Sequence, residues 1–162
     1  FADFVKGPAA AIGHLRELLG RDRPREAGHN PLGGAMVVML LFAVLLQAGA
    51  GLVSADTDTG MVNGPLANAI ADRWVDRLTS FHKFWINVLL AMVALHVLAA
   101  VVYLVWKKQN LIGAMITGRK PLDDVVPPGK PAPKLFFAPG RLALSVLLAA
   151  AAVVYFIVRA GS

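Results

Sequence analysis

The sequence predicts an all-α integral membrane protein, and three observations support this class. Apolar residues make up 57% of the 162 residues and charged residues only 16%, whereas a soluble domain carries about a quarter charged residues. Three segments contain no Asp, Glu, Lys or Arg, namely 32–53, 84–106 and 142–158. Crossing the hydrocarbon core of a bilayer takes about 20 apolar residues in a helix. The sequence therefore indicates three spanning helices and excludes a soluble enzyme, a disordered chain and a collagen-like fibre.

The number of cysteines and the distribution of Lys and Arg exclude several classes of function. The chain contains no cysteine, which excludes a disulfide, a Cys-ligated zinc, an iron–sulfur cluster and a thioether-attached c-type haem within it. Lys and Arg number five in 1–31, three in 54–83, seven in 107–141, and one after residue 158. Because basic residues concentrate in cytoplasmic segments, we expect the N-terminus and 107–141 in the cytoplasm. This topology accounts for the net charge of +6, so nucleic-acid binding is not expected.

The first elements are a short helix and the first spanning helix. Pro8 and Gly20 are suited to begin and end a helix. We expect this helix to be amphipathic and to lie either on the cytoplasmic membrane surface or against neighbouring segments of the protein. A polar linker follows up to residue 28. Asn30 is a favourable N-cap and Pro31 fits the first turn, so the first spanning helix is expected to begin there.

The outward-facing segment 54–83 carries two patterns. Asp56 and Asp58 resemble the opening of a calcium loop, but the third carboxylate and the distal Glu are absent, so calcium is not expected. An apolar residue recurs every four positions at Leu66, Ile70, Trp74 and Leu78, which predicts an amphipathic stretch beginning near Gly64.

The second spanning helix ends at Lys107 and Lys108, and the third occupies 142–162. Aromatic residues mark both interfaces of a membrane, so we expect Trp74 and Trp85 at the outer one and Tyr103 and Trp106 at the inner one. A proline-rich linker lies in 107–141 and acts as a semi-rigid spacer. The third helix has no function indicated beyond anchoring or contact with another subunit.

The histidines carry the chemistry. His96 lies inside an uncharged span, and an ionisable side chain at that depth indicates function, unless it is a neutral histidine bonded to a neighbouring helix. His82 precedes it by fourteen residues. In a helix this spacing puts both imidazoles within about 40° of one face and about 21 Å apart. The pair suits two haems, each needing a second axial ligand from another helix, with space left by Ala91, Ala94, Ala99 and Ala100.

A transmembrane proton relay fits the same spacing, although it would normally recruit Asp or Glu partners that these spans lack. His29 stands at the start of the first span, where it would line a quinone pocket rather than bind the same iron as His96. His14 is expected to be solvated.

Three stretches carry a family resemblance. They are residues 1–8 (FADFVKGP) with 28–34 (GHNPLGG), the pair His82 and His96, and 109–120 (QNLIGAMITGRK) directly after the second span. With these the chain resembles the C-terminal half of a bacterial di-haem cytochrome b561, related to the b-type cytochrome subunit of Ni/Fe hydrogenases. The resemblance covers about residues 1–120.

The resemblance implies a four-helix haem-binding bundle with one additional C-terminal helix. The segments would be a cytoplasmic part (1–28), haem-binding helices (29–106), the linker (107–141) and the extra helix (142–162). In this family the last helix of the bundle gives one axial ligand to each of two b haems. His82 and His96 match these ligands, so the metal that they would bind is haem iron. The partner histidines resemble residues of the family's first two helices. We therefore expect the sequence to be part of a longer chain, or a partner subunit to supply those ligands.

The implied function is electron transfer in the bacterial inner membrane. Electrons would pass between a periplasmic c-type cytochrome, dehydrogenase or hydrogenase and the quinone pool. The candidate partners of haem propionates are Arg73, Arg77 and Lys83 outside and Lys107 and Lys108 inside, unless these are ordinary interfacial charges. Acidic residues would help to dock a basic cytochrome, namely Asp56, Asp58, Asp72 and Asp76. The alternatives are a haem-free membrane anchor or assembly subunit of a respiratory complex, and a proton-conducting bundle.

Overall fold

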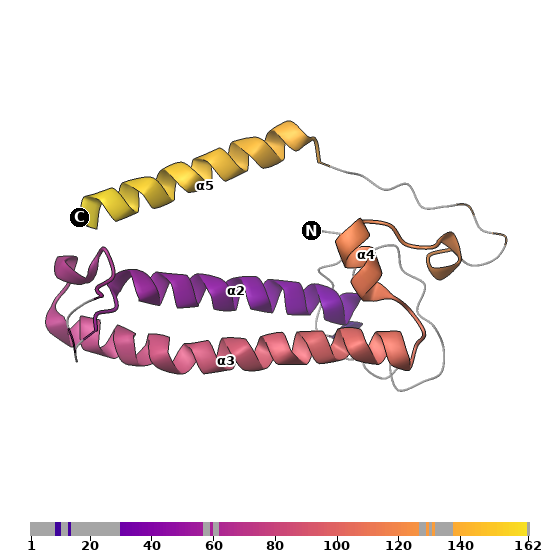
Figure 1. Ribbon diagram of the computed structural model, residues 1–162, viewed down its shortest axis with the longest axis horizontal. Coiled ribbons are helices and arrows are strands. Elements are labelled where there is room, and N and C mark those ends of the chain that lie inside the picture. Colours follow the sequence, from indigo (N-terminus) through magenta and orange to yellow (C-terminus); the bar gives the residue numbers. More distant parts are fainter. Residues whose placement is uncertain are drawn as a thin grey trace. The chain divides into compact units, whose positions relative to one another are not determined.

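The structure is all-helical in the parts that can be described. The computed structural model describes residues 9–10, 13, 30–56, 59, 62–126, 129, 131 and 138–161. Its helices are α2 (Pro31–Val53), η1 (Ala67–Ala69), α3 (Asp72–Val105), α4 (Leu111–Thr117), η2 (Leu122–Asp124) and α5 (Gly140–Gly161), as Figure 1 shows. Of the predicted helix between Pro8 and Gly20, only residues 9, 10 and 13 are described, and they are helical, whereas His14 and His29 lie outside the described residues. Within those ranges there is no strand, only an isolated bridge between Ala55 and Asn63.

Three of these helices have the length and apolarity to cross a membrane. They are α2 with 23 residues, α3 with 34 and α5 with 22. A residue in a helix rises about 1.5 Å, so all three exceed the ~30 Å hydrocarbon thickness. The predicted all-α membrane fold is confirmed.

The chain forms two compact units. One contains Phe1–Phe42 and Ala91–Lys134, and the other contains Ala43–Leu90 and Leu135–Ser162. We refer to them as the first and the second unit. Each unit therefore holds one part of α2 and one part of α3. In the second unit these parts run antiparallel, because Gln47 meets His82 while the earlier Ala43 meets the later Trp85.

The start of α2 follows the predicted capping chemistry. The Oδ1 atom of Asn30 accepts a hydrogen bond from the backbone N–H of Gly33 at 2.6 Å. This bond satisfies one of the backbone donors that the first turn of a helix leaves free. The Nδ2 atom of Asn30 also donates to the Tyr103 hydroxyl at 2.6 Å, so the cap connects α2 to α3 within the first unit.

The helix α3 begins earlier than the uncharged segment alone indicates. It starts at Asp72, which is the acidic residue of its first turn and interacts favourably with the positive end of the helix dipole. The predicted amphipathic stretch is divided, because Ile70 is extended (φ −127°, ψ 162°) between η1 and α3. His82 consequently lies within a continuous helix rather than in the connection before it.

The connection between α2 and α3 is closed by hydrogen bonds. Gly64 N–H donates to Ser54 O at 2.7 Å, and Leu66 N–H donates to Leu52 O at 2.8 Å. The buried Thr79 hydroxyl accepts from the Ala55 N–H at 3.1 Å. The connection is therefore attached to α3 one turn before His82.

The short helix α4 has a cap at each end. Asn110 Oδ1 accepts from Gly113 N–H at 2.7 Å, and Gly118 ends the helix in the left-handed conformation (φ 67°) with its N–H on Ala114 O. Glycine adopts this conformation without the penalty that a Cβ brings. By contrast, α5 contains no buried residue.

Candidate functional site

Both histidines of the described chain lie on the least exposed face of α3. The non-exposed positions of this helix and the residues just after it recur mostly every three or four residues: Val75, Leu78, Thr79, Phe81, His82, Trp85, Val88, Leu89, Met92, His96, Ala100, Tyr103 and Lys107. That spacing defines one face of an α-helix. The helix runs without interruption from Asp72 to Val105. Each histidine therefore lies on the less exposed side of its own part of α3, and their common face stays a prediction from the helical spacing.

His82 is held by the backbone of α2. Its Nδ1 atom lies 3.0 Å from the backbone oxygen of Gln47. A carbonyl oxygen can only accept a hydrogen bond, so Nδ1 carries the proton. In the neutral imidazole Nε2 then bears the lone pair. This is the tautomer in which a histidine presents Nε2 to a metal while its other nitrogen donates to a carbonyl.

Gln47 also faces the second ring nitrogen of His82. Its Nε2 atom lies 3.2 Å from His82 Nε2, and the amide is the donor because that ring nitrogen bears the lone pair. The other amide atom, Gln47 Oε1, is buried and has no hydrogen-bond partner among the described residues. A buried acceptor without a partner costs about 1–3 kcal/mol. The Gln47 amide therefore lies in front of His82 Nε2, where its nitrogen is hydrogen-bonded and its oxygen is not.

The ring of His82 also lies against a glycine of α2. A Cβ placed on Gly51 would be 3.0 Å from His82 Cε1 and 3.4 Å from Nδ1. An open cavity of about 340 Å³ adjoins the ring, and its lining includes Gly51, Thr79, His82 and Lys83. All of these residues belong to the second unit.

His96 belongs to the first unit and has a different environment. It is half-buried, and none of the described residues forms a hydrogen bond with its ring. Its neighbours on α3 include Ala100, which is half-buried, and Ala99, which is exposed. In a neutral imidazole one of the two nitrogens bears a lone pair, and no described residue is bonded to it at His96.

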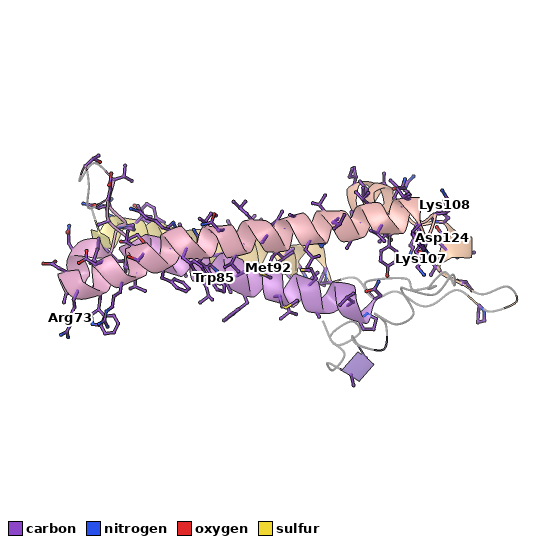
Figure 2. All side chains as sticks on the ribbon, turned by 90° about the horizontal axis from the view of Figure 1, so that it is seen from below. Arg73, Trp85, Met92, Lys107, Lys108 and Asp124 are labelled. Carbon is purple, nitrogen blue, oxygen red and sulfur yellow. The ribbon has the colours of Figure 1, made fainter. Side chains whose placement is uncertain are left out.

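The predicted cations occupy different environments. Arg73 and Lys83 are exposed, and the Arg77 guanidinium lies over the Trp74 ring at 5.3 Å from its centroid. Lys107 is only 2% exposed, whereas its neighbour Lys108 is exposed with a φ of 55°. Figure 2 shows both lysines directly beyond the C-terminal end of α3.

Two of the predicted interfacial aromatics have polar partners on or beside α2. The indole N–H of Trp85 (labelled in Figure 2) donates to Ala43 O of α2 at 3.0 Å. Tyr103 is 6% exposed and its hydroxyl accepts from Asn30. The partner of Trp85 is the buried Ala43, and the partner of Tyr103 is the half-buried Asn30, which caps the start of α2. Buried Trp and Tyr side chains usually find such partners, which a count of aromatics near the ends of a span does not reveal.

The acidic residues proposed for partner docking are only partly described. Asp72 and Asp76 are exposed on α3. Asp56 accepts hydrogen bonds from the backbone N–H and the hydroxyl of Thr59. Asp58 lies outside the described residues.

Sequence reasoning missed the two residues of α2 that contact His82. Gln47 is the only strongly polar side chain between residues 32 and 53, and an isolated polar residue in a span commonly bonds to a neighbouring helix. That signal was available in the sequence. No signal singles out Gly51 from the other glycines of the same helix.

The fold and the site together define a class: a helical membrane protein with two half-buried histidines, His82 and His96, on a spanning helix. The sequence model of the prokaryotic cytochrome b561 family matches residues 1–118, and the chain belongs to this family. No curated protein and no solved structure matches it significantly. Family membership makes it a membrane b-type cytochrome of electron transfer, which binds haem b.

The residues around His82 fit a haem iron. The Nε2 lone pair is directed away from the hydrogen bond that fixes the tautomer, and Gln47 Nε2 is its one described partner. Gln47 Oε1 has no hydrogen-bond partner among the described residues, so the side-chain amide of Gln47 is bonded there only to His82. The absence of a Cβ on Gly51 lets the edge of the His82 ring lie directly against α2. A ligand at Nε2 would displace one weak hydrogen bond and leave the Nδ1 bond intact.

Proposed function

We propose that this chain carries electrons between a periplasmic redox partner and the quinone pool through two b haems, with His82 and His96 each supplying one axial ligand. The observation that carries the proposal is the contact between His82 Nδ1 and Gln47 O, from which the tautomer of His82 follows. Its Nδ1–H is bonded to Gln47 O at 3.0 Å, which leaves Nε2 as the basic nitrogen on the inner face of α3.

The chain's own residues would hold and tune the haems in three ways. When bound, haem b supplies a one-electron Fe(III)/Fe(II) couple. The Nδ1–H bond to Gln47 O orients the His82 ring and raises the basicity of Nε2. The uncharged segment 84–106 would keep water away from His96. The fixed spacing along α3 separates the two ligands by about 21 Å, which covers most of a ~30 Å hydrocarbon core.

Each iron needs a second axial ligand. A histidine opposite each ring would complete bis-His ligation, which fills both axial positions and favours electron transfer over substrate binding. The described residues contain no histidine other than His82 and His96. We therefore place the second ligands in helices or a subunit beyond α2, α3 and α5, as expected for a four-helix bundle with α5 as an additional helix.

The distribution of basic residues supports one orientation of the chain in the membrane. The topology with Lys107 and Lys108 in the cytoplasm places Arg73, Arg77 and Lys83 on the periplasmic side of the inner membrane. We propose Lys83 as the periplasmic propionate partner, because it adjoins His82 in the cavity lining. On the cytoplasmic side, the deeply buried Lys107 is a better candidate than the exposed Lys108.

The test is a haem count on the purified full-length protein. We expect a b-type dithionite-reduced minus oxidised spectrum with two haems per chain, falling to one in His82→Ala and to one in His96→Ala. A suitable control is Asn87→Ala, because Asn87 is exposed and bonds only to backbone oxygens of its own helix. Well-folded protein without haem would contradict the proposal and favour a haem-free anchor. Full haem content in His82→Ala would exclude His82 as a ligand.

A further inference from the structure

Gly51 and Gly49 occupy the same helix but differ in what a side chain would meet. Outside its own stretch of helix, a Cβ on Gly49 would have no heavy atom of the described residues within 4 Å. A Cβ on Gly51 would lie 3.0 Å from Cε1, 3.4 Å from Nδ1 and 3.8 Å from Nε2 of His82. Its closest contact is therefore the ring carbon between the two nitrogens, and the ring would have to move by a few tenths of an ångström.

The ring has little freedom to move without cost to its hydrogen bond. Nδ1 already lies 3.0 Å from Gln47 O, which is near the usual length for an N–H···O bond. Gln47 and Gly51 are one helical turn apart on α2, so they face the same ring from adjacent turns. A displacement away from Gly51 lengthens or bends the bond to Gln47 O.

We propose that Gly51 is a positioning residue. Its missing side chain lets the Cε1 edge of the His82 ring lie close enough to α2 to keep the Nδ1–H bond to Gln47 O, and this bond sets the potential of the haem that His82 binds. This inference rests on the proposed function of His82. A hydrogen bond from Nδ1–H increases the electron donation of Nε2 to a metal. Stronger donation stabilises Fe(III), so weakening the bond raises the reduction potential.

The experiment compares Gly51→Ala with Gly49→Ala in the full-length holoprotein. Both variants add the same methyl group and the same helix propensity to α2, and only one of them touches His82. We expect Gly49→Ala to match the wild type. In Gly51→Ala, the Fe(II)/Fe(III) ratio of one haem at a fixed ambient potential should rise about tenfold, which corresponds to about 59 mV for one electron. The low-field g value of that haem's ferric EPR signal should shift as well.

The controls separate this inference from the proposed function. If His82→Ala loses one haem but the two glycine variants agree within twofold in the redox ratio, Gly51 has no positioning role and the ligand assignment stands. If His82→Ala keeps both haems, the ligand assignment itself is wrong.

A second measurement does not depend on the variant folding or on bound haem. In haem-depleted wild-type protein labelled with ¹⁵N-histidine, the His82 ring should show the Nδ1-protonated tautomer. Predominance of the Nε2-protonated tautomer would overturn the inference, because Gly51 would then have no bond to preserve.

Discussion

The contact between Asn30 and Tyr103 gives the sharpest stability prediction. Asn30 performs two tasks, capping α2 through Oδ1 and donating to Tyr103 through Nδ2, both at 2.6 Å. Loss of an Asn N-cap costs about 1 kcal/mol, and loss of the second bond costs about 1 kcal/mol more. Asn30→Ala should therefore lower the free energy of unfolding by about 2 kcal/mol.

A double-mutant cycle isolates the contact from the cap. Asn30→Ser keeps a good N-cap but is too short to reach Tyr103. Combined with Tyr103→Phe in a cycle, it should show a coupling energy of about 1 kcal/mol, slightly above the ~0.6 kcal/mol average for hydrogen bonds between membrane helices. The assay is reversible unfolding of the purified protein in mixed micelles of mild detergent and dodecyl sulfate. A coupling below about 0.3 kcal/mol would refute the reasoning, because contacting residues couple by at least ~0.5 kcal/mol.

Two further predictions use the same unfolding assay. Thr79→Val should destabilise the protein by about 1–3 kcal/mol, because it leaves the Ala55 N–H without the acceptor that Thr79 supplies at 3.1 Å. Ser80→Ala is the control, since the Ser80 hydroxyl is exposed and bonds to its own helix. Equal losses of stability in the two variants would contradict the role of Thr79. Lys107→Ala should destabilise by more than about 1 kcal/mol and Lys108→Ala by less than about 0.5 kcal/mol, because Lys107 is 2% exposed and Lys108 is exposed. A larger effect at Lys108 would show that burial at this end of α3 does not decide stability.

Local sequence signals predicted several helix boundaries well. Asn30 with Pro31 marked the start of α2, and the structure shows the expected cap. These signals are reliable because capping involves atoms only a few residues apart. The start of α3 was less predictable, because Asp72 extends the helix well beyond the uncharged segment. Absence of charge indicates where a helix can contact lipid, and a helix continues past that limit whenever its backbone bonds are satisfied.

The sequence predicted the two histidines of the candidate site but not the residues that contact them. The spacing of His82 and His96 predicted their common face, since a helix has a fixed rotation per residue. The partners of His82 were not predicted, because Gln47 lies 35 residues away on another helix. The partners of Trp85 and Tyr103, which are Ala43 of α2 and the N-cap Asn30, were not predicted for the same reason.

The sequence by itself determined the membrane class, the spanning segments, the pairing of two histidines on one helix face and the resemblance to the cytochrome b561 family. These features depend on composition and on helical periodicity, which are properties of one chain segment at a time. Only the tertiary structure decided which atom of Gln47 meets which nitrogen of His82, and that Gly51 rather than Gly49 lies against the ring. The physical reason is that the rotation and offset of two packed helices are set by side-chain fit across their interface, and no local pattern encodes that fit.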